Sequence, residues 1–296
     1  MQIERLKTFI QSANINFLFG SGLSVPYLST LNNIEKWLTN LNAESNNFNK
    51  EKIVEASLYK AYFEKVIYPN LEIGNDVNHR IVLKNYKDFL TIWNDIANKR
   101  ADKLHSKQLN IYSTNIDVFV EKAAEDVAVE FNDGFKGSIR QIFDESNFQK
   151  SFVKRSLHYQ NSFEIPVYNL LKMHGSINWS EEDNKIYNDS TLNQIKTICE
   201  KIEKIDKDYF IEIENDKNVG DFITKANEIV SKYPSVDFDN VFNDFLIEYH
   251  KLIMVNPTKH KFKETVIDVH FYELMRMFSN SLEKENTILL VMGVLF

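Results

Sequence analysis

The sequence predicts an α/β fold, a Rossmann-like parallel sheet with helices on both faces, interrupted by a helical insertion. Four short apolar runs, at residues 15–19, 109–112, 167–173 and 287–292, have the length and composition of buried strands. The stretches between them place apolar residues at helical spacing. Strands that alternate with helices indicate a parallel sheet, because parallel neighbours need a crossover connection. The 296 residues suffice for one such domain, which we assign to residues 1–296.

The N-terminal half is expected to run helix, strand, glycine loop, helix, followed by two more helices. Asn32 or Asn33 is suited to cap the second helix. Residues 42–51 are rich in Asn, Ser, Glu and Lys, which indicates a loop. The helices expected from apolar spacing cover residues 3–11, 34–41, 52–68 and 84–100.

The C-terminal half is expected to hold the other three strands and a large insertion. Residues 131–147 contain two glycines and are expected to form a loop. Residues 180–250 are charged and mostly helical in pattern, so we interpret them as a helical insertion or small subdomain. Residues 252–255 are expected to rejoin the sheet. Two further helices are expected, one capped by Asp117 and running to residue 127, the other at residues 270–283.

Composition excludes several classes of protein. A formal net charge of −7 argues against direct nucleic-acid binding, which usually depends on a basic surface. No apolar run approaches the roughly 20 residues of a membrane helix, and the N-terminus is a poor signal peptide, so we expect a cytoplasmic protein without membrane contact. The single cysteine, Cys199, excludes an internal disulfide and a four-cysteine zinc site. The seven histidines form no HxxxH pair, so no metal site is expected.

Glycine and polar residues follow four of the predicted strands. The segments are Gly20-Ser21-Gly22-Leu23-Ser24, Ser113-Thr114-Asn115-Ile116-Asp117, His174-Gly175 and the single Gly293. Because the carboxyl ends of parallel strands share one edge of the sheet, where ligands bind in α/β folds, we expect all four to meet there. This convergence predicts a nucleotide site and depends on no single motif.

The glycine turn at residues 20–24 has two interpretations. Its glycines permit a pyrophosphate to approach backbone N–H groups closely, and Ser21 and Ser24 add hydroxyl donors. Alternatively, it is an ordinary strand–helix turn. The chain lacks the GxxxxGK[ST] and GxSxG motifs, which argues against a P-loop phosphotransferase and an α/β-hydrolase.

The other motifs supply groups for catalysis. Asn115 is suited to orienting a ribose hydroxyl or a water, whereas Asp117 also serves as a helix N-cap. His174 has a pKa suited to a general base near neutral pH, although a lone histidine is more often structural. Lys172 and Asn178 are expected on the surface or in loops. We take Asn115 and His174 as the candidate catalytic residues.

In this order, the motifs resemble those of the sirtuin-like superfamily of NAD-consuming domains. In that family the first loop reads Gly-Ala-Gly-x-Ser, the second Gln-Asn-Ile-Asp or Thr-Asn-Ile-Asp, and the third His-Gly. Here they stand at residues 20–24, 114–117 and 174–175, followed by a late strand that ends in glycine. The resemblance covers most of the chain except residues 180–250, and it implies that NAD is the bound nucleotide and substrate.

Departures from the family pattern argue against a deacetylase. Sirtuin deacetylases carry four zinc-binding cysteines, whereas this chain has only Cys199. Their Pro-Asp-Phe-Arg segment is replaced by Val25-Pro26-Tyr27-Leu28, and Ser21 stands where the family has alanine. The resemblance is therefore to the bacterial sirtuin-like domains that hydrolyse NAD in anti-phage defence. These domains cleave the bond between nicotinamide and ribose and deplete the cell of NAD in abortive infection.

The resemblance also implies roles for individual residues. Asn115 would bind the nicotinamide ribose or position the attacking water, and His174 would act as the base. Asp117 would bond the nicotinamide carboxamide. The first loop would hold the pyrophosphate. The expected NAD contacts are Gly20, Ser21, Gly22, Ser24, Thr114, Asp117 and Gly293.

Partners and an incomplete C-terminus are implied as well. Family members often form homo-oligomers and are regulated by a HerA-type ATPase, a short Argonaute, a phage-derived activator or a fused sensor. They usually continue beyond the late strand, whereas this chain stops three residues after Gly293, so we expect a truncated C-terminus and an incomplete edge of the NAD site. Two alternatives stay open: a non-catalytic module that binds NAD or ADP-ribose, and a deacylase or ADP-ribosyltransferase.

Overall fold

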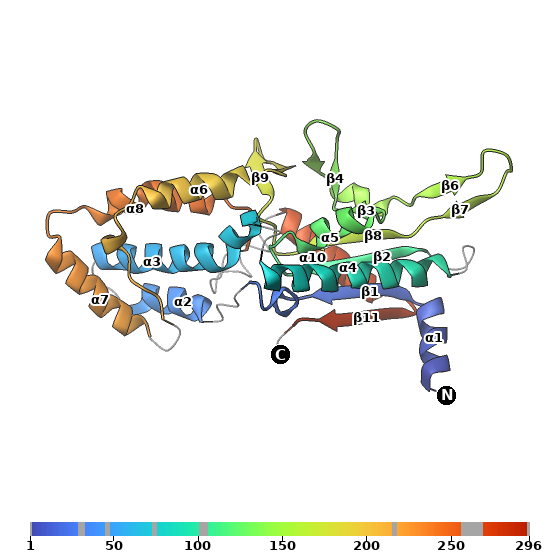
Figure 1. The fold of residues 1–296 in the computed structure, drawn as a ribbon, viewed down its shortest axis with the longest axis horizontal. Helices are drawn as coiled ribbons and strands as arrows, with labels where there is room; N and C mark the ends of the chain where they lie inside the picture. Colours follow the sequence, from blue (N-terminus) through green and yellow to red (C-terminus); the bar gives the residue numbers. More distant parts are fainter. Residues whose placement is uncertain are drawn as a thin grey trace.

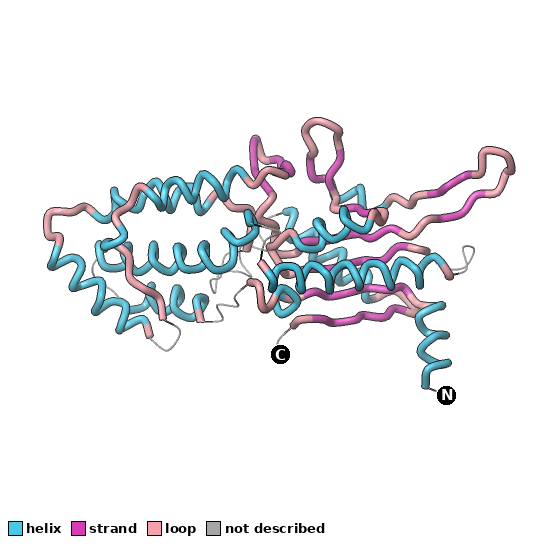
Figure 2. Tube along the Cα trace, in the orientation of Figure 1, coloured by secondary structure: helices cyan, strands magenta, loops and turns pink. Residues whose placement is uncertain are grey.

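The structure is a computed structural model that describes residues 2–28, 33–44, 48–72, 76–100, 106–214, 218–255 and 269–294. It confirms the predicted α/β fold. A five-stranded parallel sheet occupies one end of an elongated molecule, and a group of helices occupies the other (Figure 1). Figure 2 shows that this second lobe is built almost entirely from helices.

The sheet has the strand order β11-β1-β2-β8-β3, and every neighbouring pair is parallel. The four long strands fall where the apolar runs predict them, whereas β3 lies in the segment expected to be a loop. The strand bounds are β1 (Asn14–Phe19), β2 (Gln108–Ser113), β3 (Phe131–Asn132), β8 (Val167–Lys172) and β11 (Thr287–Met292). Since all of them run in one direction, their carboxyl ends lie along one edge of the sheet.

Both faces of the sheet are covered, as continuous apolar strands require. On one face, alternate side chains such as Phe17 and Ile111 pack against α4 (Val77–Asn98) and α5 (Phe119–Val127). On the other, Tyr112 and Leu171 pack with α10 (Val269–Leu282). A small antiparallel sheet also contributes to this second face, formed by β4 (Phe135–Lys136), β5 (Ile142–Phe143), β9 (Trp179–Glu182) and β10 (Lys185–Asn188).

A row of asparagine side chains crosses four of the strands in register. Asn110 on β2 donates to Asn16 on β1 at 2.9 Å and accepts from Asn169 on β8 at 2.9 Å. Asn132 on β3 donates to Asn169 at 3.0 Å. Because a slip of one residue would send each amide to the opposite, apolar face, this row fixes the strand register.

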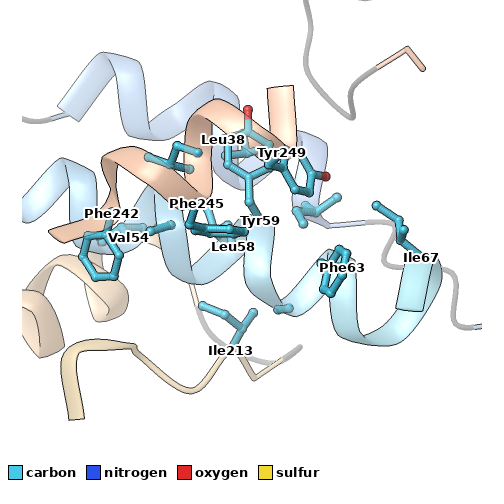
Figure 3. Close-up of a cluster of buried hydrophobic side chains, with 14 of the residues drawn as sticks. Leu38, Val54, Leu58, Tyr59, Phe63, Ile67, Ile213, Phe242, Phe245 and Tyr249 are labelled. Atoms are coloured by element: carbon cyan, nitrogen blue, oxygen red, sulfur yellow. The ribbon is translucent and has the colours of Figure 1, made fainter. Parts of the chain in front are cut away.

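The helical lobe combines two distant stretches of the chain. Helices α2 (Ile34–Glu44) and α3 (Phe48–Tyr62) pack with α6 (Asn193–Glu203), α7 (Val219–Lys232) and α8 (Phe238–His250). Helix α3 continues into a π-helical turn, η2 (Phe63–Ile67), and a 3₁₀ turn, η3 (Tyr68–Glu72). Figure 3 shows the hydrophobic core of the helical lobe, where Leu58 of α3 packs with Phe245 and Tyr249 of α8.

Some expected elements differ in the structure. Within the segment expected to be a loop at 42–51, residues 42–44 belong to α2 and 48–51 to α3, whereas 45–47 lie outside the described residues. Residues 131–147 form short strands and the 3₁₀ turn η4 (Glu145–Gln149) rather than only a loop. Met254 makes one antiparallel bridge with Gly175, so residues 252–255 do not rejoin the sheet. Asn32, one of the two expected N-caps, lies outside the described residues.

The remaining elements lie at the periphery. Helix α1 (Gln2–Ser12) precedes the sheet as predicted. The segment 180–250, expected to be a mostly helical insertion, begins with the hairpin of β9 and β10 and continues as helices. A separate hairpin of β6 (Val153–Arg155) and β7 (Ser162–Glu164) projects from the body, far from the helical lobe (Figure 1).

Candidate functional site

The expected polar residues meet in a pocket at the carboxyl edge of the sheet. The pocket has a volume of about 240 Å³ and lies between the sheet and the helical lobe. Its polar walls come from the segments that follow β1, β2 and β8, and η2 contributes from the helical lobe. The lining residues are Ser21, Ser24, Leu28, Tyr62, Val66, Thr114, Asn115, Ile116, Asp117, His174 and Val255.

The glycine turn forms the 3₁₀ element η1 (Ser21–Ser24) and rests on the end of β11. The N–H of Gly20 donates to the Met292 carbonyl at 2.9 Å, and that of Gly22 to the Gly293 carbonyl at 2.8 Å. Leu23 N–H closes the turn onto the Gly20 carbonyl at 3.1 Å. These three N–H groups are therefore engaged within the protein, which corrects the expectation that the glycines offer them to a phosphate.

Gly293 follows β11 and contacts the glycine turn through its backbone. It is not among the residues that line the pocket. Its φ is +65°, and a Cβ there would lie 2.5 Å from the Leu23 nitrogen and 2.8 Å from the Gly20 carbonyl oxygen. Only glycine allows this close approach of backbones. Among the first loop's residues, Ser21 and Ser24 face the pocket, whereas Gly20 and Gly22 shape the turn.

A buried hydrogen-bond network connects three of the expected residues. Ser24 donates to Asp117 Oδ2 at 2.6 Å, and the Ser24 hydroxyl lies 3.3 Å from that of Tyr86 on α4. The Asn115 amide donates from Nδ2 to the Tyr86 hydroxyl at 3.4 Å. Asp117 Oδ1 also accepts the N–H of Phe119, the first residue of α5, at 3.2 Å. The N-cap position itself is Val118, one residue later than predicted, so Asp117 supports the start of the helix from just outside it.

Asn115 carries the clearest sign of an unfilled interaction. The residue is only 4% exposed, and its Oδ1 has no hydrogen-bond partner among the described residues. Since Nδ2 is bound to Tyr86, the oxygen is the free end of the amide. A buried acceptor without a partner costs about 1–3 kcal/mol. A bound hydroxyl or water in the pocket would satisfy it.

His174 lies at the end of β8 and is half-buried in the pocket wall. Its carbonyl accepts the N–H of Val255 at 2.8 Å, which draws the segment after α8 over the site. Gly175 has a φ of +73°, and a Cβ there would lie 2.1 Å from the Ile253 carbonyl oxygen. Glycine is thus required next to His174 so that the two segments can meet.

Lys172 is buried rather than on the surface, and so is Asn178. The Lys172 ammonium donates to the carbonyls of Asp117 and, at 3.3 Å, Asn115. It also pairs with Glu121 on α5 at 3.2 Å. Burial is the largest cause that raises the pKa of the Glu121 carboxyl, and the charge of Lys172 opposes it. Lys172 therefore fixes the backbone of Asn115 and Asp117 through their carbonyl groups.

Tyr62 and Tyr86 contribute uncharged hydroxyl groups at or beside the pocket. Burial and then the nearby Asp117 carboxylate raise the pKa of Tyr62 to about 12. The same two causes raise the pKa of Tyr86 well above its ordinary value. Both hydroxyls keep their proton at neutral pH and so have the capacity to donate a hydrogen bond.

The structure brings together Ser21, Ser24, Thr114, Asn115, Asp117 and His174, as the strand ends predict. Sequence reasoning missed Tyr62, Tyr86 and Lys172. Of these, only Lys172 could have been found from the sequence. It is the last residue of a buried strand and lies two residues before His174, so it must lie at the same carboxyl edge of the sheet. The tyrosines fall within helical apolar patterns, where they are indistinguishable from core residues.

Comparison with known proteins leaves the chain without an assigned family: it matches no family model and no curated protein. Within the described residues, no group of three or more His, Cys, Asp or Glu side chains could hold a metal ion. Over the same residues, no helix has the length and apolar character needed to cross a membrane.

Proposed function

We propose that the chain hydrolyses NAD to nicotinamide and ADP-ribose. The observation that carries this proposal is the Asn115 amide, buried at the sheet edge with its oxygen unpartnered, in the same pocket as His174. An acceptor of this kind fits a ribose hydroxyl or the attacking water. The resemblance of three ordered motifs to sirtuin-like domains supports NAD as the substrate.

Hydrolysis places modest demands on these groups. The C1′–nitrogen bond of NAD breaks, and its electron pair stays on the nicotinamide nitrogen, which becomes neutral. The ribose carbon becomes oxocarbenium-like, so accurate placement of water contributes more than a strong nucleophile. The water oxygen then bonds to C1′, and His174 accepts the proton that the water loses. Asp117 and Ser24 would orient the carboxamide of the leaving nicotinamide.

The test is an assay of nicotinamide release by the purified chain, alone and with the product of its neighbouring gene. Asn115→Ala and His174→Ala should each lower the rate about 100-fold, the usual range for a lost positioned acid, base or dipole. Asn85→Ala, at an exposed position on α4, is the matched control and should keep the full rate. Full activity of either site variant would reject the assigned roles.

A second candidate is a module that binds NAD or ADP-ribose without turnover. It is favoured by the unpartnered Asn115 oxygen, which could accept a ribose hydroxyl without any catalytic step. Calorimetry followed by product analysis separates the two functions. Binding without nicotinamide release would favour the module. Release that required an acyl-lysine peptide would instead favour a deacylase, the third possibility.

The biological role that follows from this chemistry is NAD depletion in anti-phage defence, under the control of a partner protein. It rests on the resemblance alone. Expression of the chain with its neighbouring gene should lower cellular NAD on phage infection, and His174→Ala should abolish that fall. Protection of the cells from phage with an unchanged NAD level would show that the defence depends on another reaction.

A further inference from the structure

Asp117 places a buried carboxylate in the wall of the pocket. The residue is only 3% exposed. Its carboxylate accepts hydrogen bonds from Ser24 and from the Phe119 N–H, but it makes no ion pair among the described residues. Lys172 does not neutralise it, because the Lys172 ammonium pairs with Glu121 and otherwise binds backbone carbonyls. Since buried charges normally have a partner of opposite charge, this carboxylate points to a positive charge on the ligand.

The rest of the pocket wall offers no permanent positive charge. Among the described residues that line it, none is lysine or arginine, and only His174 can become a cation by taking up a proton. Burial and then the Asp117 carboxylate raise the pKa of Tyr62 to about 12, so the negative field reaches the wall formed by the helical lobe. The pocket is therefore suited to a cation.

A pyrophosphate would find little support in this pocket. The N–H groups of Gly20, Gly22 and Leu23 bind carbonyls of the protein, so they are not free to bind a phosphate. The unpaired Asp117 carboxylate would also repel a phosphate. The volume of about 240 Å³ lies below the roughly 300–1,000 Å³ of pockets that enclose drug-sized ligands. The pocket therefore fits one nucleoside better than a dinucleotide.

The nicotinamide riboside half of NAD combines the properties that these observations require. Its ring nitrogen is positively charged, its ribose has hydroxyls for the unpartnered Asn115 oxygen, and it has no phosphate. We propose that the pocket selects a positively charged N-riboside, so that nicotinamide riboside alone is bound and hydrolysed about as well as NAD. This inference rests on the proposed hydrolysis of NAD and assigns recognition to the nucleoside half of the substrate.

The reaction with the nucleoside is the same hydrolysis. The C1′–nitrogen bond breaks with its electron pair left on the ring nitrogen, the oxygen of water bonds to C1′, and His174 accepts the proton that the water loses. The products are nicotinamide and ribose. Positive charge moves only from the ring nitrogen to the adjacent C1′ in the transition state, so a carboxylate in the pocket favours both states.

Nicotinamide release from the two substrates tests whether the pyrophosphate matters. The wild-type chain, alone and with the product of its neighbouring gene, should cleave nicotinamide riboside with a kcat/KM within about threefold of that for NAD, because a solvent-exposed pyrophosphate makes only weak, screened contacts. A preference for NAD of more than about 100-fold would overturn the proposal, since it requires a built phosphate site. Release from neither substrate would instead reject the proposed hydrolysis, and binding then decides whether the pocket selects a cation.

Calorimetry measures this selection without turnover. In His174→Ala, nicotinamide riboside should bind about 30-fold more tightly than its reduced dihydro form, which has nearly the same shape and an uncharged ring. Adding Asp117→Asn, which keeps an acceptor for the Phe119 N–H, should cut this ratio below about threefold. Adding Asp133→Asn is the matched control and should leave the ratio unchanged. The Asp133 carboxylate follows β3 at the same edge and accepts the Phe135 N–H at 3.0 Å, but it does not line the pocket.

Two outcomes of the binding experiment would overturn the proposal. Equal affinity for the charged and the reduced form, the absence of binding by both included, would show that the pocket does not select a cation. Equal losses of the ratio in Asp117→Asn and Asp133→Asn would show that the Asp117 carboxylate is not the group that recognises the charge.

Discussion

The chemistry of the pocket depends on which way the Asn115 amide is turned. Its Nδ2 donates to Tyr86, so Oδ1 is the end of the amide that has no partner among the described residues. Without the tyrosine hydroxyl, either end of the amide could face the pocket. We predict that Tyr86→Phe lowers the kcat for nicotinamide release about tenfold, equivalent to one hydrogen bond of about 1.4 kcal/mol, with KM within about twofold. Steady-state kinetics on the purified variant measure both constants.

Tyr168 provides the matched control for this prediction. It is also buried, and its hydroxyl donates to the Leu90 carbonyl of the same helix, α4, at 2.6 Å. Tyr168→Phe should lower the free energy of unfolding by about 1 kcal/mol and leave kcat unchanged. Equal losses of kcat in both variants would show that Tyr86 acts only through stability.

His79 is expected to make the free energy of unfolding depend on pH. The ring is fully buried, stacks on Phe119 with centroids 5.0 Å apart, and has no hydrogen-bond partner at either nitrogen among the described residues. Burial lowers its pKa. Above the ordinary histidine value of about 6.5, both states are neutral; as pH falls below it, the unfolded state takes up the proton first and stability is lost.

His79→Phe removes this loss and two unpaired polar atoms. We predict a free energy of unfolding about 1 kcal/mol higher at pH 7, and a difference from wild type that grows as pH falls from about 6.5 towards 5. Denaturant titrations across this pH range measure the difference directly. A difference that stays constant with pH would contradict the titration of His79.

At the scale of elements, Lys172 joins the ends of β2 and β8 to the start of α5. Its ammonium binds two loop carbonyls and pairs with Glu121 Oε1, whereas Glu121 Oε2 has no partner within the described residues. We predict that Lys172→Met costs about 3 kcal/mol of stability, because it leaves the partly buried Glu121 carboxylate unpaired. It should also reduce nicotinamide release, since Asn115 and Asp117 lose their support.

A double variant separates these two effects. Adding Glu121→Leu to Lys172→Met removes the unpaired charge and should restore more than half of the lost stability. Activity should stay low, because the carbonyls of the loop remain without their donor. Denaturant unfolding and the nicotinamide assay are compared for the single and double variants. Recovery of both properties together would assign Lys172 a purely structural role.

Elements with strong local patterns could be predicted from the sequence. The four apolar runs became parallel strands because continuous burial on both faces leaves a clear signature. Asn115 and His174 could be placed together because parallel strands end at one edge. Tyr86 and Tyr62 could not, since they reach the site through the packing of α4 and of the C-terminal end of α3, which local spacing does not encode.

Other misses have equally specific causes. Lys172 is buried because loop carbonyls and Glu121 satisfy its charge, and those partners are up to 57 residues away in sequence. The hairpin of β9 and β10 interrupts a segment whose charge pattern indicates helices. Residues 252–255 look like a strand but pair only at Gly175, because the His174 segment curls away from the sheet to meet them.

At the scale of the whole molecule, the pocket lies where two separate hydrophobic cores meet. Tyr62 and Val66 come from the helical lobe, whereas Ser21, Asn115 and His174 come from the sheet. Ile116 in the pocket wall already packs into the core of the helical lobe. A ligand in this pocket would contact both lobes at once. The proposed substrate should therefore stabilise them together rather than only the strand ends.

We predict that NAD at about 100 times its Kd stabilises the chain by about 2.7 kcal/mol, and that the gain extends to α3 and η2 as well as to β2 and β8. Hydrogen exchange, resolved by peptide, measures the two lobes separately. The labelling uses His174→Ala, which should prevent turnover while keeping the Asn115 acceptor. Adding Asn115→Ala to it is the control and should lose most of the protection in both lobes. Protection confined to the sheet side would place the ligand outside the pocket, because only a ligand that contacts both lobes couples their local unfolding.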